Sequence, residues 1–200
     1  MDGIYFYWFS WMLWVIYTFL MKKDKVRILF AVTLLMLIAL SIYEISIGPF
    51  QLTLSYLFIL FMAFYFAAMR SRWQFIYMLI GSMIVTLAYV SFQLFALFDP
   101  IWVFLDRTWM LAVILTIIVI LLYGGFYSRL LCFIIGSCQG DFLYAVILKR
   151  FSFPHVIGSL AFFDMLLLSW SLMFGWFVLE NASAYVDLLA QKGMKETKQS

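Results

Sequence analysis

The stretch 132-CFIIGSCQGDFLY-144 places Gln139 and Asp141 beside two glycines in an otherwise apolar run. An ionisable side chain inside a bilayer costs roughly 2.5–3.5 kcal/mol on insertion scales, so it needs a partner or a function. On a helix, the small and polar residues of this run fall within about 140° of one another. They are Gly136, Ser137, Gly140, Asp141 and Tyr144, with Ile135, Phe142 and Val146 opposite. We therefore expect a membrane helix with one face toward protein and the other toward lipid.

The composition of the whole chain is that of a polytopic membrane protein. Of its 200 residues, 67% are hydrophobic and 12% are charged, against roughly 25% charged residues in ordinary soluble domains. Apolar runs close to the roughly 20 residues that span a bilayer recur from Tyr5 to Leu179. The net charge is +3, but the basic residues form short clusters between these runs, as topology signals do. This distribution predicts contact with the lipid bilayer and no nucleic-acid partner.

The apolar runs predict an all-α bundle of about seven transmembrane helices. Gly48 and Pro49 end the second run, and Asp106 and Arg107 delay the start of the fifth. We expect helices over about 4–21, 28–47, 52–69, 73–98, 108–123, 128–148 and 154–179. Residues 1–180 would form the bundle and residues 181–200 a short polar cytoplasmic tail. Six spans remain the alternative.

The distribution of Lys and Arg predicts the orientation. With seven spans, ten basic residues fall on one side: Lys22, Lys23, Lys25, Arg27, Arg70, Arg72, Arg129, Lys192, Lys195 and Lys198. Only Arg107, Lys149 and Arg150 fall on the other side. Because cytoplasmic loops carry the excess of basic residues, we expect the N-terminus outside and the tail in the cytoplasm.

Polar residues within the expected spans form the candidate site. In this topology Glu44, Asp141 and Asp164 fall in the outer half of the bilayer, each on a different helix. The full candidate set is Glu44, Gln93, Gln139, Asp141 and Asp164. One interpretation is a hydrogen-bonded network that fixes helix register. The other is an outward-opening cavity for an ion, a cationic group or a lipid headgroup.

Three glycines are candidates for close helix packing. Gly136 and Gly140 form a GxxxG motif, which lets a neighbouring helix backbone approach. Gly175 shares a stripe of about 40° with Asp164 and Ser171 on the seventh expected helix.

Enzymatic chemistry has little support in the sequence. The only histidine, His155, follows Pro154 at an expected helix start, with no Ser, Cys or Glu nearby in a nucleophile pattern. HExxH and glycine-rich phosphate-loop motifs do not occur. The sequence therefore predicts a protein that is not an enzyme and that has no cofactor and no metal site.

Two segments carry a resemblance to a known family. MDGIYFYWFSWMLWVIYTFLMKK (1–23) and GSCQGDFLYAVIL (136–148) resemble the YphA family of Bacillus and related spore-forming Firmicutes. The resemblance covers nearly the whole chain. It implies a bacterial cytoplasmic-membrane protein of about this size, in a family whose function is uncharacterised, and it supplies no catalytic residues.

A second similarity concerns the same helix. Gly136, Gly140 and Asp141 are similar to the glycine-and-aspartate helix of MreD-like proteins and of the substrate-binding subunits of energy-coupling vitamin transporters. Those six-span proteins work by partnering others. Here the Asp follows the second glycine immediately, whereas in those proteins it stands several residues later.

These observations lead to two functional hypotheses. The first is a non-enzymatic partner or scaffold subunit of the bacterial cell envelope, with a membrane protein as its possible partner. The second is a small transporter or lipid-handling protein that uses Glu44, Asp141 and Asp164. The oligomeric state does not follow from the sequence.

Overall fold

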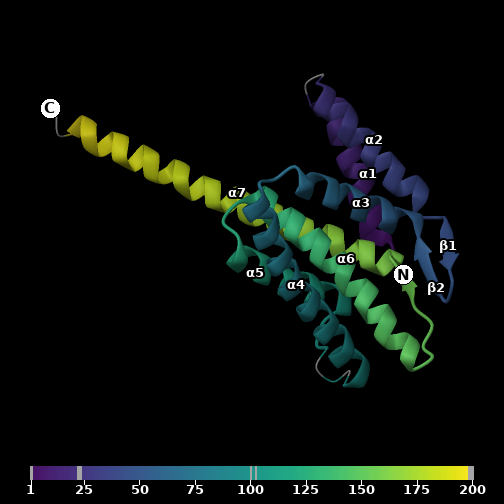
Figure 1. Ribbon diagram of the computed structural model, residues 1–200. Coiled ribbons are helices and arrows are strands. Elements are labelled where there is room, and N and C mark those ends of the chain that lie inside the picture. The colour runs from purple at the N-terminus through teal and green to yellow at the C-terminus, as the bar shows by residue number, and fades with distance from the viewer. Residues whose placement is uncertain (1, 22–23, 100, 102, 198–200) are drawn as a thin grey trace.

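A bundle of α-helices with a small sheet at one end makes up the fold (Figure 1). The computed structural model describes the backbone of residues 2–21, 24–99, 101 and 103–197, and the side chains of these residues except 25, 26 and 183–197. The helices are α1 (Ile4–Val15), continued by the π-helical segment η1 (Ile16–Leu20), α2 (Lys25–Leu40), α3 (Leu54–Ala68), α4 (Arg72–Phe98), α5 (Arg107–Leu122), α6 (Phe126–Arg150) and α7 (Leu160–Thr197). The strands are β1 (Glu44–Ile47), β2 (Phe50–Thr53) and β3 (Val156–Ile157).

Within the described part of the chain, three helices are long and apolar enough to cross a membrane: α4, α6 and, in α7, Leu160–Ala182. The other apolar helices are shorter, namely Ile4–Leu20, Arg27–Leu40, Leu54–Ala68 and Arg107–Leu122. A helix of 16 residues rises about 24 Å, less than the roughly 30 Å of a hydrocarbon core. The mainly helical fold agrees with the sequence prediction. Seven spans and an outside N-terminus stay predictions.

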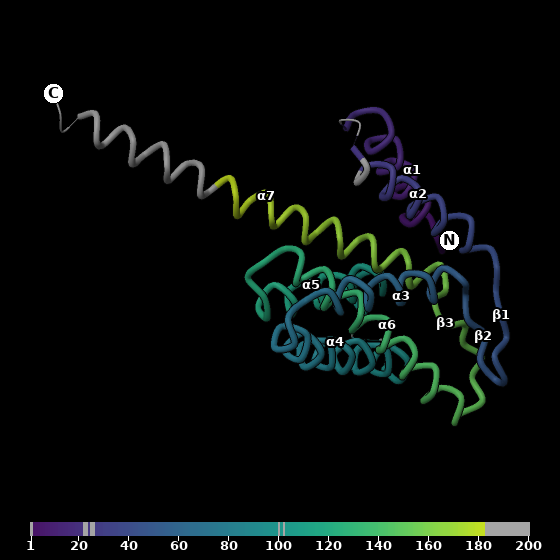
Figure 2. Tube along the Cα trace, turned by 45° about the horizontal axis from the view of Figure 1, so that its top comes forward, coloured from purple at the N-terminus to yellow at the C-terminus, as the bar shows by residue number. Residues whose placement is uncertain are grey.

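Helix α6 is the central element of the bundle and contacts α3, α4, α5 and α7 (Figure 2). Its glycines allow α4 to approach closely. A Cβ atom at Gly136 would lie 2.6 Å from the Cβ of Val85, and one at Gly140 would lie 2.8 Å from Tyr89. Side chains larger than hydrogen would push the two helices apart, so both positions require glycine.

Gly175 does not take part in helix packing, and that prediction is wrong. A Cβ atom added there would meet no atom within 4 Å. The reason is that Gly175 lies on an exposed side of α7, whereas α6 meets this segment through Phe174, Phe177 and Glu180.

The second helix is shorter than predicted because its C-terminal third belongs to a hairpin. Helix α2 ends at Leu40, and β1 pairs antiparallel with β2 through the two-residue loop Gly48–Pro49. The alternating Ile and Ser residues of 45–47 suit a strand, and Gly48 has φ +61°, a conformation that favours glycine. The prediction of an all-α fold is therefore wrong in this segment, and Glu44 lies on an exposed strand.

The seventh helix begins later and ends later than predicted. Before it, β3 pairs in parallel with β2, and Gly158 adopts φ +73°, so the helix starts at Leu160 instead of Pro154. Its backbone continues to Thr197, past the predicted end at Leu179. The lysines at 192, 195 and 198 lie outside the described side chains.

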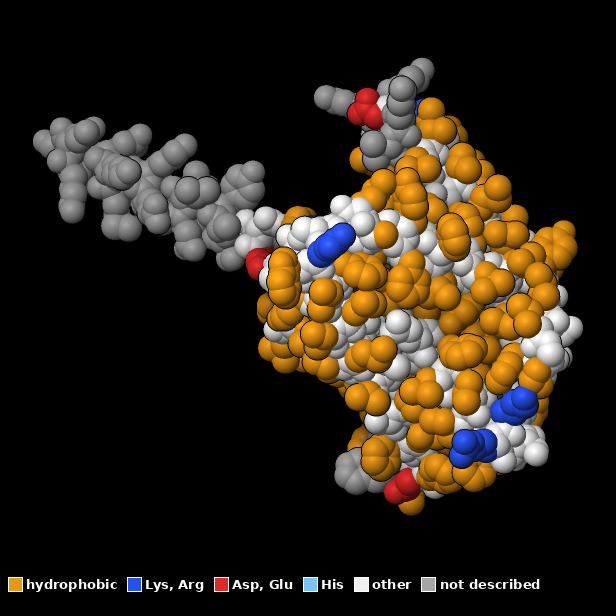
Figure 3. Space-filling model, in the orientation of Figure 1, with side chains coloured by type: hydrophobic (Ala, Val, Ile, Leu, Met, Phe, Trp, Pro, Cys, Tyr) orange, Lys and Arg blue, Asp and Glu red, His pale blue; other side chains and the backbone are white. Residues whose placement is uncertain are grey.

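The two ends of the bundle differ in character. We call the end that carries β1–β3 the sheet end; the start of α1, the start of α5 and residues 141–164 lie there as well, joined by contacts such as Trp109 Nε1 to Tyr5 Oη, 3.0 Å. At the opposite, far end, Arg129 pairs with Glu180 at 2.9 Å and Tyr123 donates to the carbonyl of Tyr77. On the face shown in Figure 3, hydrophobic side chains cover most of the surface between the charged groups near the two ends.

Candidate functional site

Asp141 of α6 is the buried centre of a polar cluster at the sheet end. Its side chain is 1% exposed. The carboxylate accepts hydrogen bonds from the hydroxyl of Tyr89 (3.0 Å) and the backbone amide of Gly158 (2.7 Å), and it contacts Nε2 of His155 at 3.0 Å. These donors come from α4, from the turn after β3 and from the segment before it. Three separate parts of the chain therefore converge on one carboxylate.

The cluster continues from Tyr89 to a cation. Gln93 Nε2 donates to the hydroxyl of Tyr89 (3.2 Å), and Arg107 Nε donates to Oε1 of Gln93 (2.7 Å). Arg107 Nη2 also donates to the hydroxyl of Tyr144 (3.3 Å), whose ring meets that of His155 edge-on. Tyr89, Gln93, Arg107, Asp141, Tyr144 and His155 together are called the polar cluster below.

A cavity of about 230 Å³ lies beside the polar cluster. It is lined by residues of α4, α5, α6, the segment between α6 and α7, and the start of α7: Tyr89, Gln93, Arg107, Thr108, Leu111, Tyr144, His155, Ser159, Ala161, Phe162 and Met165. Five of the six cluster residues face it, and Asp141 does not. Its volume lies below the roughly 300–1,000 Å³ of drug-sized sites. The cavity can accommodate a small polar group.

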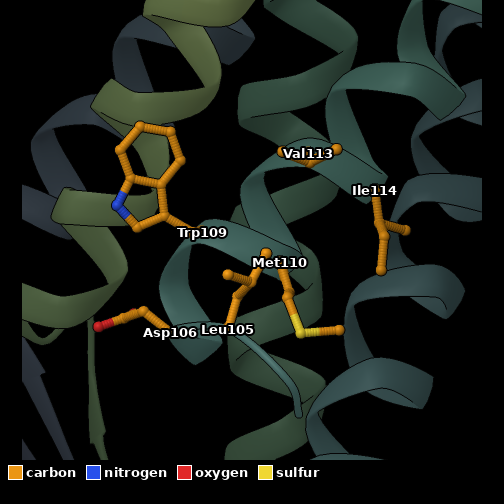
Figure 4. Close-up of a pocket in the computed structure, with 6 residues that line it drawn as sticks. All are labelled: Leu105, Asp106, Trp109, Met110, Val113 and Ile114. Atoms are coloured by element: carbon orange, nitrogen blue, oxygen red, sulfur yellow. The ribbon is translucent and has the colours of Figure 1, made fainter. Parts of the chain in front are cut away.

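A second, apolar depression runs along α5 (Figure 4). It has a volume of about 480 Å³ and is lined by Leu105, Asp106, Trp109, Met110, Val113 and Ile114. The single carboxylate, that of Asp106, accepts a hydrogen bond from the amide of Thr108 at 2.8 Å and caps α5. The remaining wall suits hydrocarbon. Because Arg107 and Thr108 belong to the same helical turn, α5 borders both the cavity and this depression.

Asp164 has a different role from Asp141. Its two carboxylate oxygens accept hydrogen bonds from the backbone amides of Gly3 and Phe6, both at 2.6 Å. Amides at a helix N-terminus lack intrahelical partners, so Asp164 caps α1 and joins it to α7. This contact is structural, and Asp164 does not line the cavity.

Gln139 and Glu44 also lie apart from the cavity. Gln139 accepts hydrogen bonds from the hydroxyls of Ser82 (3.4 Å) and Thr86 (3.3 Å) and so joins α6 to α4. Glu44 is exposed on β1. Of the five candidates, the structure brings together Gln93 and Asp141, through the hydroxyl of Tyr89. Glu44, Gln139 and Asp164 do not line the cavity, so the five residues do not form one site.

Sequence reasoning gave too little weight to His155, placed Tyr144 on the polar face of its helix without assigning it to the site, and did not identify Tyr89. His155 stands in the segment that leads into β3, and the pairing of β3 with β2 brings it to Asp141. A local signal was present for the tyrosines, because residues three and four apart share a helix face. Tyr89 precedes Gln93 by four positions, and Tyr144 follows Asp141 by three.

Comparison with known proteins agrees with the resemblance noted in the sequence. The family model described as YphA-like integral membrane protein matches residues 2–199. A curated relative from Bacillus subtilis (strain 168), named "Uncharacterized protein YphA", is 29% identical over 195 residues, which are 98% of this chain and 94% of the relative. No solved structure matches the chain.

Proposed function

We propose that this chain, which belongs to the YphA-like integral membrane protein family, is a lipid-handling protein that holds a lipid headgroup in the cavity beside the polar cluster. The observation that carries the proposal is a cavity of about 230 Å³ walled by hydrogen-bonding side chains at one end of a membrane bundle. The apolar depression on α5 borders the same helical turn and would receive a hydrocarbon chain. A polar cavity next to an apolar depression suits an amphiphile.

Our proposal includes the topology of seven spans with the N-terminus outside, in the cell membrane. Contacts at the sheet end join the start of α1 to α7 and β2 to β3, and those at the far end join Arg129 to Glu180. This arrangement suits segments that run alternately up and down. The sheet end would then face outward, because Arg27, Arg70, Arg72 and Arg129 belong to the far end.

Reporter fusions test this topology. A reporter placed after Lys25, Arg72 or Lys198 is expected to report the cytoplasm. An external signal from the fusion at Lys198 would contradict seven spans and favour six.

The polar cluster supports binding more than catalysis. Ser159 lines the cavity together with His155, but no hydrogen bond joins these two side chains. Nucleophilic catalysis needs a base within hydrogen-bond reach of the nucleophile. We therefore propose a role without enzymatic chemistry.

The competing proposal is the partner or scaffold role in the cell envelope. For a membrane protein, exposed apolar side chains suit lipid as well as protein, so the surface of the described residues does not favour this role. It becomes one outcome of the experiment below.

Native mass spectrometry of the chain, gently extracted with its own membrane lipids, tests the headgroup site. The wild type is expected to retain lipid in a fixed ratio, and Ala161→Leu, which fills the cavity without changing charge, is expected to lose it. Ala39→Leu is the matched control, because Ala39 is exposed on α2. A stoichiometric protein partner, together with lipid retention that Ala161→Leu leaves unchanged, would support the scaffold role and contradict ours.

A further inference from the structure

We infer that the cavity selects an anionic phosphate headgroup, and that Arg107 is the residue that recognises its charge. This inference rests on the proposed headgroup site and names the class of ligand. It narrows the expectation from sequence, in which a cavity with carboxylates would bind an ion, a cationic group or a lipid headgroup.

The charge of Arg107 is not neutralised by its surroundings. Its three hydrogen bonds go to the side chain and the backbone carbonyl of Gln93 and to the hydroxyl of Tyr144, which are all neutral groups. Among the described residues, Arg129 pairs with Glu180 and His155 with Asp141, but Arg107 has no ion-pair partner. Its Nη1 donates to no described residue, so it has N–H groups left for a ligand.

Asp141 does not present its negative charge to the cavity. It is 1% exposed and does not line the cavity, and its three described contacts are with Gly158 and with two residues of the cavity wall, Tyr89 and His155. None of the residues that line the cavity carries a carboxylate. Of the side chains that line the cavity, those of Arg107 and His155 are therefore the ones that can present a positive charge to a ligand.

The start of α7 adds to the positive character of the cavity. Ser159, Ala161 and Phe162 line it. The first amides of a helix have no intrahelical acceptor and carry the positive end of the helix dipole, which favours an anion. This feature supports the role of Arg107 and does not carry the inference alone.

These observations distinguish two classes of phospholipid. A guanidinium binds phosphate oxygens with two parallel hydrogen bonds, so the phosphate suits Arg107. A zwitterionic headgroup would also bring an ammonium group into a cavity whose wall has no carboxylate to pair with it. An anionic headgroup that carries only hydroxyl groups beside its phosphate meets no such penalty.

Competition between two lipids tests the inference. The wild-type chain is equilibrated with vesicles of equal parts phosphatidylglycerol and phosphatidylcholine, and the retained lipids are identified by native mass spectrometry. We expect phosphatidylglycerol to be retained about tenfold more, a difference of about 1.4 kcal/mol, because phosphatidylcholine brings an ammonium group for which the cavity wall has no carboxylate. Equal retention of the two lipids would overturn the inference without needing any variant.

Variants assign the preference to Arg107. Arg107→Gln is expected to remove the preference and Arg107→Lys to keep most of it. Arg150→Gln is the matched control. It removes one positive charge from an exposed residue at the end of α6, at the same end of the bundle as Arg107. A preference that survives Arg107→Gln, or that Arg150→Gln removes as well, would overturn the assignment.

The same experiment separates failure of this inference from failure of the proposed function. If Ala161→Leu releases both lipids but the wild type shows no preference, the headgroup site stands and charge selection fails. If Ala161→Leu releases neither, both fail. Added glycerol 3-phosphate identifies the source of the anion: displacement of the lipid by this compound but not by glycerol indicates a soluble phosphate ester, and no displacement indicates the lipid.

Discussion

Asp141 and Asp164 are two buried carboxylates at the same end of the bundle, yet they have different roles. Asp164 accepts hydrogen bonds from two backbone amides and caps α1. Asp141 holds the side chains of Tyr89 and His155, which themselves line a cavity. Both carboxylates are buried, so burial does not distinguish their roles; the groups that donate hydrogen bonds to them do. Backbone donors indicate a cap, and side-chain donors that also face open space indicate a site.

The largest loss of stability is expected from a substitution that pushes α6, the helix that carries Asp141, away from α4. Gly136→Leu would place a side chain against Val85 and the carbonyl of Ser82, so it should lower the free energy of unfolding by about 3 kcal/mol. Gly175→Leu, which meets open space, should have little effect. The yield and the melting temperature of the purified chain measure both. Equal losses for the two variants would contradict the close α4–α6 contact.

The next effect compares the two carboxylates directly. Asp164→Asn leaves one of two backbone N–H groups facing an amide NH₂, so we expect a loss of about 2 kcal/mol in stability. Asp141→Asn should lose less than about 1 kcal/mol, because its NH₂ group can donate to Tyr89 or His155 while its carbonyl accepts from Gly158. Denaturation curves of the two variants check this order.

Lipid retention sharpens the same comparison. Asp141→Asn should weaken retention per folded molecule, since its amide can hold only one of Tyr89 and His155, which both line the cavity. Asp164→Asn should leave retention per folded molecule unchanged. The opposite pattern would show that the two roles are wrongly assigned.

Removal of one hydroxyl group is expected to cost less stability than Gly136→Leu or Asp164→Asn. Tyr89→Phe removes a donor to Asp141 and an acceptor for Gln93. We expect a loss of about 1 kcal/mol in stability and a measurable loss of lipid retention. Tyr56→Phe is the matched control, because Tyr56 is also buried and donates to the carbonyl of Cys138 on α6 but does not line the cavity. Tyr56→Phe should cost similar stability and leave retention unchanged. Parallel losses of retention would indicate a general loosening of the bundle.

The helices follow from the sequence to within a few residues where apolar runs and turn signals decide them. The start of α4, near Arg72, is the clearest case. Residues 44–47 could not be assigned this way, because a short apolar segment suits a helix end as well as a strand. Only pairing with β2, and through it with β3 more than 100 residues later, favours the strand.

The candidate site was predictable in part. Asp141 and Gln93 were identifiable because a polar residue in an apolar helix is costly. His155 was not, since its approach to Asp141 depends on the position of β3 and on the positive φ of Gly158. Asp164 was wrongly grouped with Asp141 because its partners are backbone amides, which have no signature in the sequence.

An experimental density map of the wild-type chain in phosphatidylglycerol nanodiscs is the most direct test of the central claim. We predict headgroup density in the cavity, with phosphate oxygens within hydrogen-bond distance of Arg107 and none beside Asp164. A cavity that holds only water, while lipid is ordered elsewhere on the bundle, would contradict the account.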